Sequence, residues 1–118
     1  MTRAARWSVT LLIAGALLGG PAFGADKKIE RLWKSKCASC HGADGKGQTD
    51  KGKKMKIDDY STAEWQKAHT DDQIKKAIND GFKGEKDGAK QEMDGYKADL
   101  SAEQIDGLVQ FTRSLGPK

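Results

Sequence analysis

The sequence contains only two cysteines, Cys37 and Cys40, and they stand three positions apart. A pair this close cannot build a framework of disulfides between distant segments. The chain also lacks an alternating run of β-branched residues, so we expect no strands. Its lysines are interleaved with aspartate and glutamate, and no pattern of stacking aromatics accompanies them, so nothing favours nucleic-acid binding. These absences leave a helical domain without the usual covalent cross-links.

The N-terminal segment has the pattern of a secretory signal peptide. Arg3 and Arg6 precede an apolar run, Val9 to Leu18, that is too short to span a bilayer comfortably. Small residues at Ala22 and Gly24 predict cleavage after Gly24. An uncleaved membrane anchor is the alternative. No cysteine stands at the cleavage site, which argues against a lipid anchor.

We therefore expect a signal peptide over residues 1–24 and one domain over residues 25–118, with no stable membrane insertion after cleavage. The segment removed contains two arginines and no acidic residue, so the formal charge falls from +4 to +2. A domain of this size buries a modest core and would be marginally stable without a further constraint. The sequence must supply that constraint from something other than disulfides.

The motif Cys37-Ala38-Ser39-Cys40-His41 is typical of covalent c-type haem attachment. On a helical turn its two cysteines and its histidine face one way. Two thiols on one face can form thioethers with the two vinyl groups of a single haem, and the adjacent imidazole can reach the iron. A covalent haem would also supply the missing apolar bulk and cross-linking.

The cysteine pair has three other interpretations. A redox dithiol of the thioredoxin kind requires a βαβ context, which the sequence does not show. A structural zinc site requires four ligands, and only the distant His69 is left to join the motif. A local disulfide is the third. A purified protein without colour would favour one of these.

Helical periodicity predicts an all-α domain of about four short helices with long loops. The first helix begins near Asp26 and runs to about Ser39, and the other three begin at capping boxes that start at Ser61, Thr70 and Ser101. We expect polar loops over Lys46 to Lys56 and Lys83 to Gln91. The glycine-rich segment 42–47 is expected to wrap the haem edge and to offer a carbonyl to the His41 ring.

Three residues are candidates for the sixth iron ligand: Met93, Met55 and His69. Met93 lies between helices and is followed by Gly95, which permits a tight turn. Met55 suits an apolar anchor in a polar loop, and His69 directly precedes a helix cap. We favour Met93, whose thioether would raise the reduction potential, with His69 second.

At this point the chain resembles the class I cytochromes c of the small bacterial monohaem kind. The resemblance covers most of residues 25–118 and rests on Leu32-Trp33, Cys37 through Gly42, Asp44 through Gly47, Met93 before Tyr96, and Leu100-Ser101 through Leu115. It implies that the first and last helices cross, that Cys37 and Cys40 hold one haem c, and that His41 and Met93 are the axial ligands. Tyr60, Trp65 and Tyr96 either donate hydrogen bonds to the haem propionates or only pack.

The chain departs from this family at three places. Ala43-Asp44 and Asp94 stand where the family often has proline, and Ile29 stands where it often has a glycine at the helix crossing. Gly107 on the last helix is expected to return the space that Ile29 takes.

We expect a periplasmic, monomeric one-electron carrier that is not an enzyme and that meets donor and acceptor proteins. The alternative, which the Asp94 substitution suggests, is a haem protein with a labile sixth ligand that binds or reduces a small molecule such as peroxide.

Overall fold

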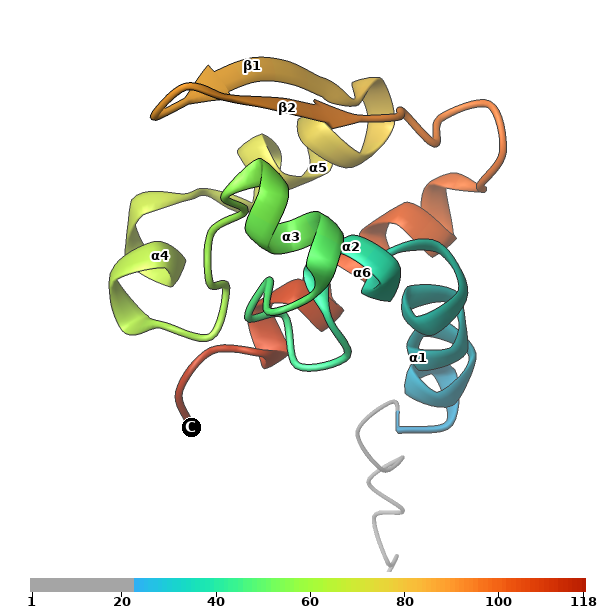
Figure 1. Ribbon diagram of the computed structural model, residues 1–118. Helices are drawn as coiled ribbons and strands as arrows, with labels where there is room; N and C mark the ends of the chain where they lie inside the picture. The colour runs from blue at the N-terminus through green and yellow to red at the C-terminus, as the bar shows by residue number, and fades with distance from the viewer. Residues whose placement is uncertain (1–22) are drawn as a thin grey trace, which may run out of the picture.

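A computed structural model describes residues 23–118 of the chain, which form six helices and one β-hairpin (Figure 1). The helices are α1 (Phe23–Lys36), α2 (Ala38–His41), α3 (Asp50–Met55), α4 (Ala63–Ala68), α5 (Asp71–Asp80) and α6 (Ala102–Ser114); the strands are β1 (Phe82–Lys86) and β2 (Ala89–Met93). The predominantly helical fold is confirmed. The predicted signal peptide lies outside the described residues except for its last two positions, so the signal and the domain boundary stay predictions.

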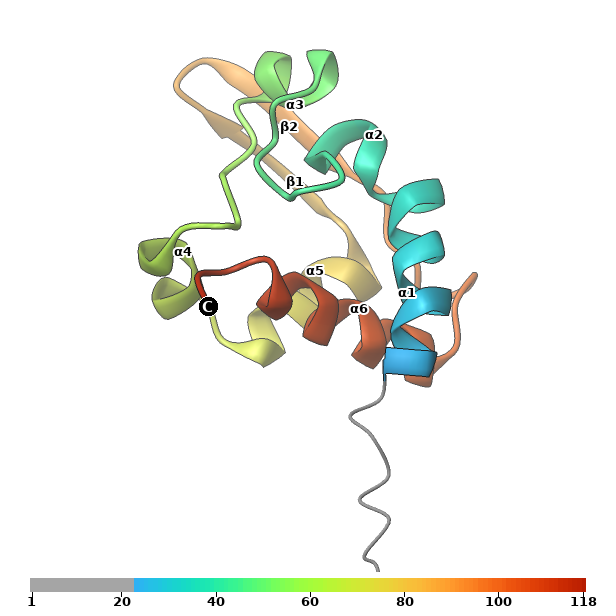
Figure 2. The same cartoon turned by 90° about the horizontal axis from the view of Figure 1, so that it is seen from below.

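The first and last helices cross and form the centre of the core. α1 packs against α6, and α6 also packs against α5, as Figures 1 and 2 show. The buried apolar residues come from these three helices and the motif: Trp33, Cys37, Ile74, Ile78, Ile105, Leu108 and Val109. Burial of these side chains is the main force that holds the helices together.

The crossing of α1 and α6 depends on Gly107, as expected. A Cβ atom at Gly107 would lie 2.5 Å from Ile29 Cδ1, closer than atoms can approach. The bulk of Ile29 therefore faces a position with no side chain. This confirms that a glycine on the last helix compensates for the isoleucine on the first.

Two of the three predicted capping boxes are present in full. Thr70 and Ser101 accept hydrogen bonds from the backbone N–H of Gln73 and Gln104, and those glutamines accept in return. The third was placed one residue early, because the N-cap of α4 is Thr62 and not Ser61. α1 begins at Phe23, before the Asp26 predicted to cap it.

The segment Lys83 to Gln91 is not the predicted loop, and the expectation of no strands was wrong. β1 and β2 pair antiparallel, with Phe82 opposite Met93, and are joined by Asp87 and Gly88. Both turn residues have positive φ, 48° and 81°. An Asp-Gly pair with these angles is the preferred two-residue hairpin turn.

The predicted loop Lys46 to Lys56 also contains a helix, α3. Thr49 caps it by accepting a hydrogen bond from Gly52 N. A Cβ atom at the buried Gly52 would lie 2.6 Å from the Cys40 carbonyl oxygen and even closer to the Gly47 oxygen. The backbone of α3 therefore lies directly against the motif, at a distance that only glycine allows.

None of the described helices is long and apolar enough to cross a membrane.

We predict that Gly107→Leu lowers the stability of the haem-loaded protein by about 1–3 kcal/mol, because the new side chain overlaps Ile29. Denaturant unfolding measures this. Adding Ile29→Ala should restore much of the loss, since it vacates the space. A double variant no more stable than Gly107→Leu would contradict the account of the crossing.

We also predict that Gly52→Ala destabilises the protein by about 1–3 kcal/mol, although alanine is the better helix former, because the atoms in the way are backbone oxygens. Lys53→Ala on the exposed face of α3 is the matched control and should be close to neutral. Equal unfolding midpoints for the two variants would show that α3 does not pack on the motif this closely.

Candidate functional site

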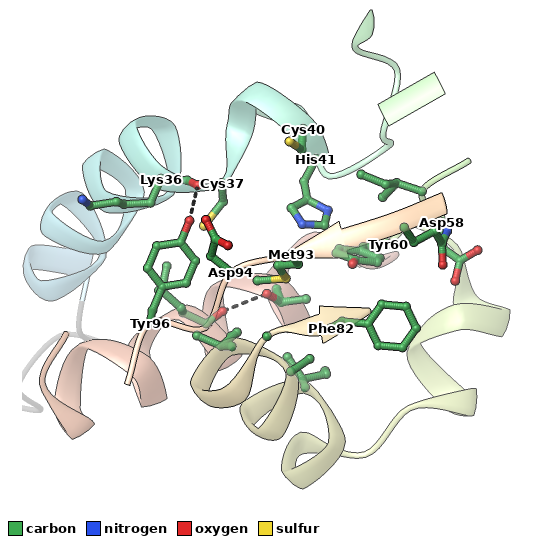
Figure 3. A pocket seen from close by; sticks show the side chains of 18 of the residues that line it. Lys36, Cys37, Cys40, His41, Asp58, Tyr60, Phe82, Met93, Asp94 and Tyr96 are labelled. Atoms are coloured by element: carbon green, nitrogen blue, oxygen red, sulfur yellow. Dashed lines mark hydrogen bonds between the residues drawn. The ribbon is translucent and has the colours of Figure 1, made fainter. Parts of the chain in front are cut away.

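The motif lies on the wall of the main cavity of the described structure. Cys37, Cys40 and His41 all line this cavity, whose volume is about 710 Å³. In Figure 3 the His41 ring extends from α2 into the pocket, and the two sulfurs lie beside it. The turn of α2 with its N-cap residue Cys37 thus presents the three side chains to the same cavity, as the spacing predicted.

The backbone of the motif is held by the segment that follows it. Thr49 Oγ1 donates to the Cys40 carbonyl at 2.7 Å, and Gly47 N donates to the His41 carbonyl at 2.8 Å. Because these carbonyls end a four-residue helix, they would otherwise lack partners. The loop and α3 therefore fix the direction in which His41 leaves the backbone.

Trp33 donates a hydrogen bond to one carbonyl of the glycine-rich segment. Its Nε1–H donates to Gly42 O at 2.9 Å, and its ring lies 5.8 Å from the imidazole. His41 Nδ1 is buried and has no hydrogen-bond partner within the described residues. The expected carbonyl bond to His41 is thus absent, since the glycine-rich loop is braced by the indole instead.

Burial sets the protonation of the site. It lowers the pKa of His41 to about 4, so the imidazole is neutral at pH 7 and has a lone pair for a metal. Burial, with a smaller contribution from Cys40, raises the pKa of the Cys37 thiol to about 11. The chain thus holds a neutral ring and a protonated thiol side by side.

All three candidates for the sixth ligand line the same cavity. Met93 is half-buried at the end of β2 and packs against the core. His69 is already engaged: its ring stacks on Trp65 with centroids 4.3 Å apart, and its Nδ1 lies 2.9 Å from the Trp65 carbonyl. Met55 ends α3, the helix packed on the motif itself.

The aromatic side chains near the cavity differ in their contacts. Tyr60 lies between His41 and Trp65, with ring centroids 5.0 Å and 4.1 Å away, and burial is the main reason that its pKa is raised. Tyr96 Oη donates to Lys36 O at 3.1 Å, which ties the turn after Met93 to the end of α1 (Figure 3).

The residues present fit a haem. The cavity has the size typical of cofactor sites, which is about 300–1,000 Å³, and its walls include apolar side chains of Ile74, Ile78 and Leu108. The buried imidazole of His41 is neutral and offers one lone pair to a metal. Residues 23–118 contain no group of three or more His, Cys, Asp or Glu able to hold a metal ion, so the zinc interpretation lacks ligands in this part of the chain.

Sequence reasoning missed the hairpin that carries Met93 and the side chain of Gln91. The Asp87-Gly88 pair was the signal that identifies the hairpin. The alternation of inward and outward residues on β2 then places Gln91 and Met93 on one face. Nothing in the sequence indicates what Gln91 contacts.

Comparison with known proteins identifies the family. The family model described as cytochrome c oxidase, cbb3-type, subunit III, matches residues 24–111. No curated protein sequence matches the chain. Among solved structures, the KustC0563 c-type cytochrome is 30% identical with a TM-score of 0.62, covering 75% of this chain and 96% of its own. A Tyr-to-Phe mutant of that protein gives 30% identity and a TM-score of 0.60, with 74% and 96% covered. The chain therefore belongs to the cytochrome c family that this model represents.

Proposed function

We propose that the protein is an exported one-electron carrier with a single haem c, held through Cys37 and Cys40, and with His41 and Met93 as axial ligands. One observation carries this proposal: the motif and Met93 line the same cavity but come from different elements, α2 and β2. Two ligands that come from different elements, α2 and β2, can bind a metal from two sides.

When bound, haem supplies an iron that accepts and returns one electron. The chain's own residues hold, orient and shield that group. The apolar side chains of Ile74, Ile78 and Leu108 exclude water from the cavity, and Thr49 and Trp33 fix the backbone around His41. A site that is rigid in both oxidation states limits reorganisation. No substrate is required, so we propose a carrier and not an enzyme.

The choice of Met93 over His69 rests on the contacts of the two residues. Two aromatic rings, Tyr60 and Trp65, stand in the row between His41 and His69. Release of His69 would cost its stacking on Trp65. Met93 has no aromatic stacking to lose, and a thioether ligand raises the reduction potential, which suits an electron carrier.

The turn after Met93 also argues against a labile ligand. Asp94 replaces the proline common in the family, but Tyr96 N donates to Ile78 O at 2.8 Å and Lys97 N to Asn79 O at 3.2 Å. A Cβ atom at Gly95 would lie 2.6 Å from Asn79 O. Packing and hydrogen bonds on the end of α5 thus take over the restraint that a proline ring would give.

Export is proposed from residues 1–24, with the mature protein in the periplasm as a monomer. The lack of a membrane-crossing helix within residues 23–118 is compatible with this. Donor and acceptor proteins are expected partners.

We predict that Met93→Ala removes the sulfur-to-iron charge-transfer band of the ferric protein and lowers the reduction potential, since the thioether favours ferrous iron. Met55→Ala and His69→Ala are matched controls and should keep the band. Absorption spectroscopy and potentiometry measure both effects. A band that survives Met93→Ala, or disappears in Met55→Ala, would show that the ligand is assigned wrongly. Rapid binding of carbon monoxide by the reduced wild type would favour the labile-site alternative.

We predict further that the intact exported protein has the mass of residues 25–118 plus one haem, and that the haem survives acid extraction. The double variant Cys37→Ser with Cys40→Ser should lose it to the solvent phase, while Ser39→Ala retains it. Mass spectrometry of the denatured protein reads out both the attachment and the cleavage site. A colourless wild type with free or disulfide-bonded cysteines would refute the haem assignment.

A further inference from the structure

The strand that carries Met93 has one face turned toward the cavity. Ala89, Gln91 and Met93 are half-buried, whereas Lys90 and Glu92 are exposed. Side chains two positions apart on a strand point the same way. Gln91 and Met93 therefore share the more buried face of β2, and both line the cavity, as does Glu92 between them.

The Gln91 amide joins β2 to the end of α3. Its Nε2 donates to Met55 O at 2.8 Å and to Lys56 O at 3.2 Å. Carbonyl groups at the C-terminus of a helix have no partner within the helix, so they are available to an outside donor. One side chain thus bonds two carbonyl groups that lie 35 and 36 residues earlier in the sequence.

α3 is in turn fixed to the haem motif. Thr49 at its start donates to Cys40 O, and Gly52 lies against the same carbonyl. A continuous path of contacts therefore leads from Met93 through Gln91 and α3 to Cys40, beside His41. The path links α2 and β2, the two elements that carry the proposed axial ligands His41 and Met93.

The other bonds between the hairpin and this region are at its far end. Lys56 Nζ donates to Asp87 O at 2.7 Å, and Lys86 pairs with Asp58. The Lys56 bond is exposed, and the Lys86 and Asp58 side chains are 42% and 45% exposed, so solvent screens this ion pair and it contributes little. Gln91 is the attachment nearest to Met93, which lies two residues away on the same strand.

We propose that Gln91 is a positioning residue that keeps Met93 at the haem by tying β2 to α3. The proposal rests on the proposed function, because it takes Met93 as the sixth ligand. A movement of β2 away from α3 would carry Met93 away from the iron, and the two hydrogen bonds of Gln91 oppose that movement. Its role is to set how often the sixth position opens.

The test is carbon monoxide binding to the reduced, haem-loaded protein, together with the ferric charge-transfer band. Gln91→Leu removes both donor hydrogens and should raise the carbon monoxide binding rate about tenfold, as the loss of one or two hydrogen bonds predicts. The isosteric Gln91→Glu should do the same, and it serves if the leucine variant does not fold. Gln91→Lys keeps a donor on a flexible stem and should recover part of the wild-type rate.

Lys86→Ala is the matched control, because it loosens the same hairpin at its far end. A purely structural role for Gln91 would lower the unfolding midpoint of Gln91→Leu and leave its carbon monoxide binding rate at the wild-type value. A wild-type rate in Gln91→Leu and Gln91→Glu, or an equal increase in Lys86→Ala, would overturn the proposal.

Met93→Ala separates the two levels of the argument. If it abolishes the band while the Gln91 variants behave as wild type, only the positioning role fails. If the band survives in Met93→Ala, the ligand assignment fails, and the role of Gln91 fails with it.

Discussion

The close contact between the backbone of α3 and the carbonyl of Cys40 is the constraint on which the site depends. Gly52 makes it possible, and Thr49 adds a hydrogen bond to the same oxygen. With α3 held there, the short helix α2 has a fixed support, and His41 points into the cavity. The same helix receives Gln91 from β2. The attachment motif and the strand that carries Met93 are thus both fixed to α3.

Burial of His41 has a cost that the chain alone does not recover. His41 is 9% exposed, its Nδ1 has no partner among residues 23–118, and its pKa is lowered to about 4. A fold that keeps an imidazole neutral and dry gains from a ligand that uses its lone pair. This links the stability of a small domain to the cofactor, as the scarcity of disulfides suggested.

Much of this structure could be predicted because its signals are local. The spacing of Cys37, Cys40 and His41 on a helical turn, the capping boxes at Thr70 and Ser101, and the apolar face of α6 are each contained in a few neighbouring residues. Even the pairing of Ile29 with Gly107 followed from the expectation that two helices cross.

The hairpin was missed because its strands lack β-branched residues, and the Asp87-Gly88 turn outweighs that deficiency. Gln91 was beyond prediction, because its partners are main-chain carbonyls 35 and 36 residues away whose position depends on the whole fold. The same holds for Trp33, whose ring N–H bonds Gly42 O in the segment that was expected to offer a carbonyl to His41.

The most direct test of the central claim is a reduced-minus-oxidised spectrum of the mature protein recorded during a redox titration. The account predicts one c-type haem with a single one-electron transition and, in the ferric state, the band of a sulfur ligand. A protein without haem, or a haem whose ferric form lacks that band at neutral pH, would contradict it.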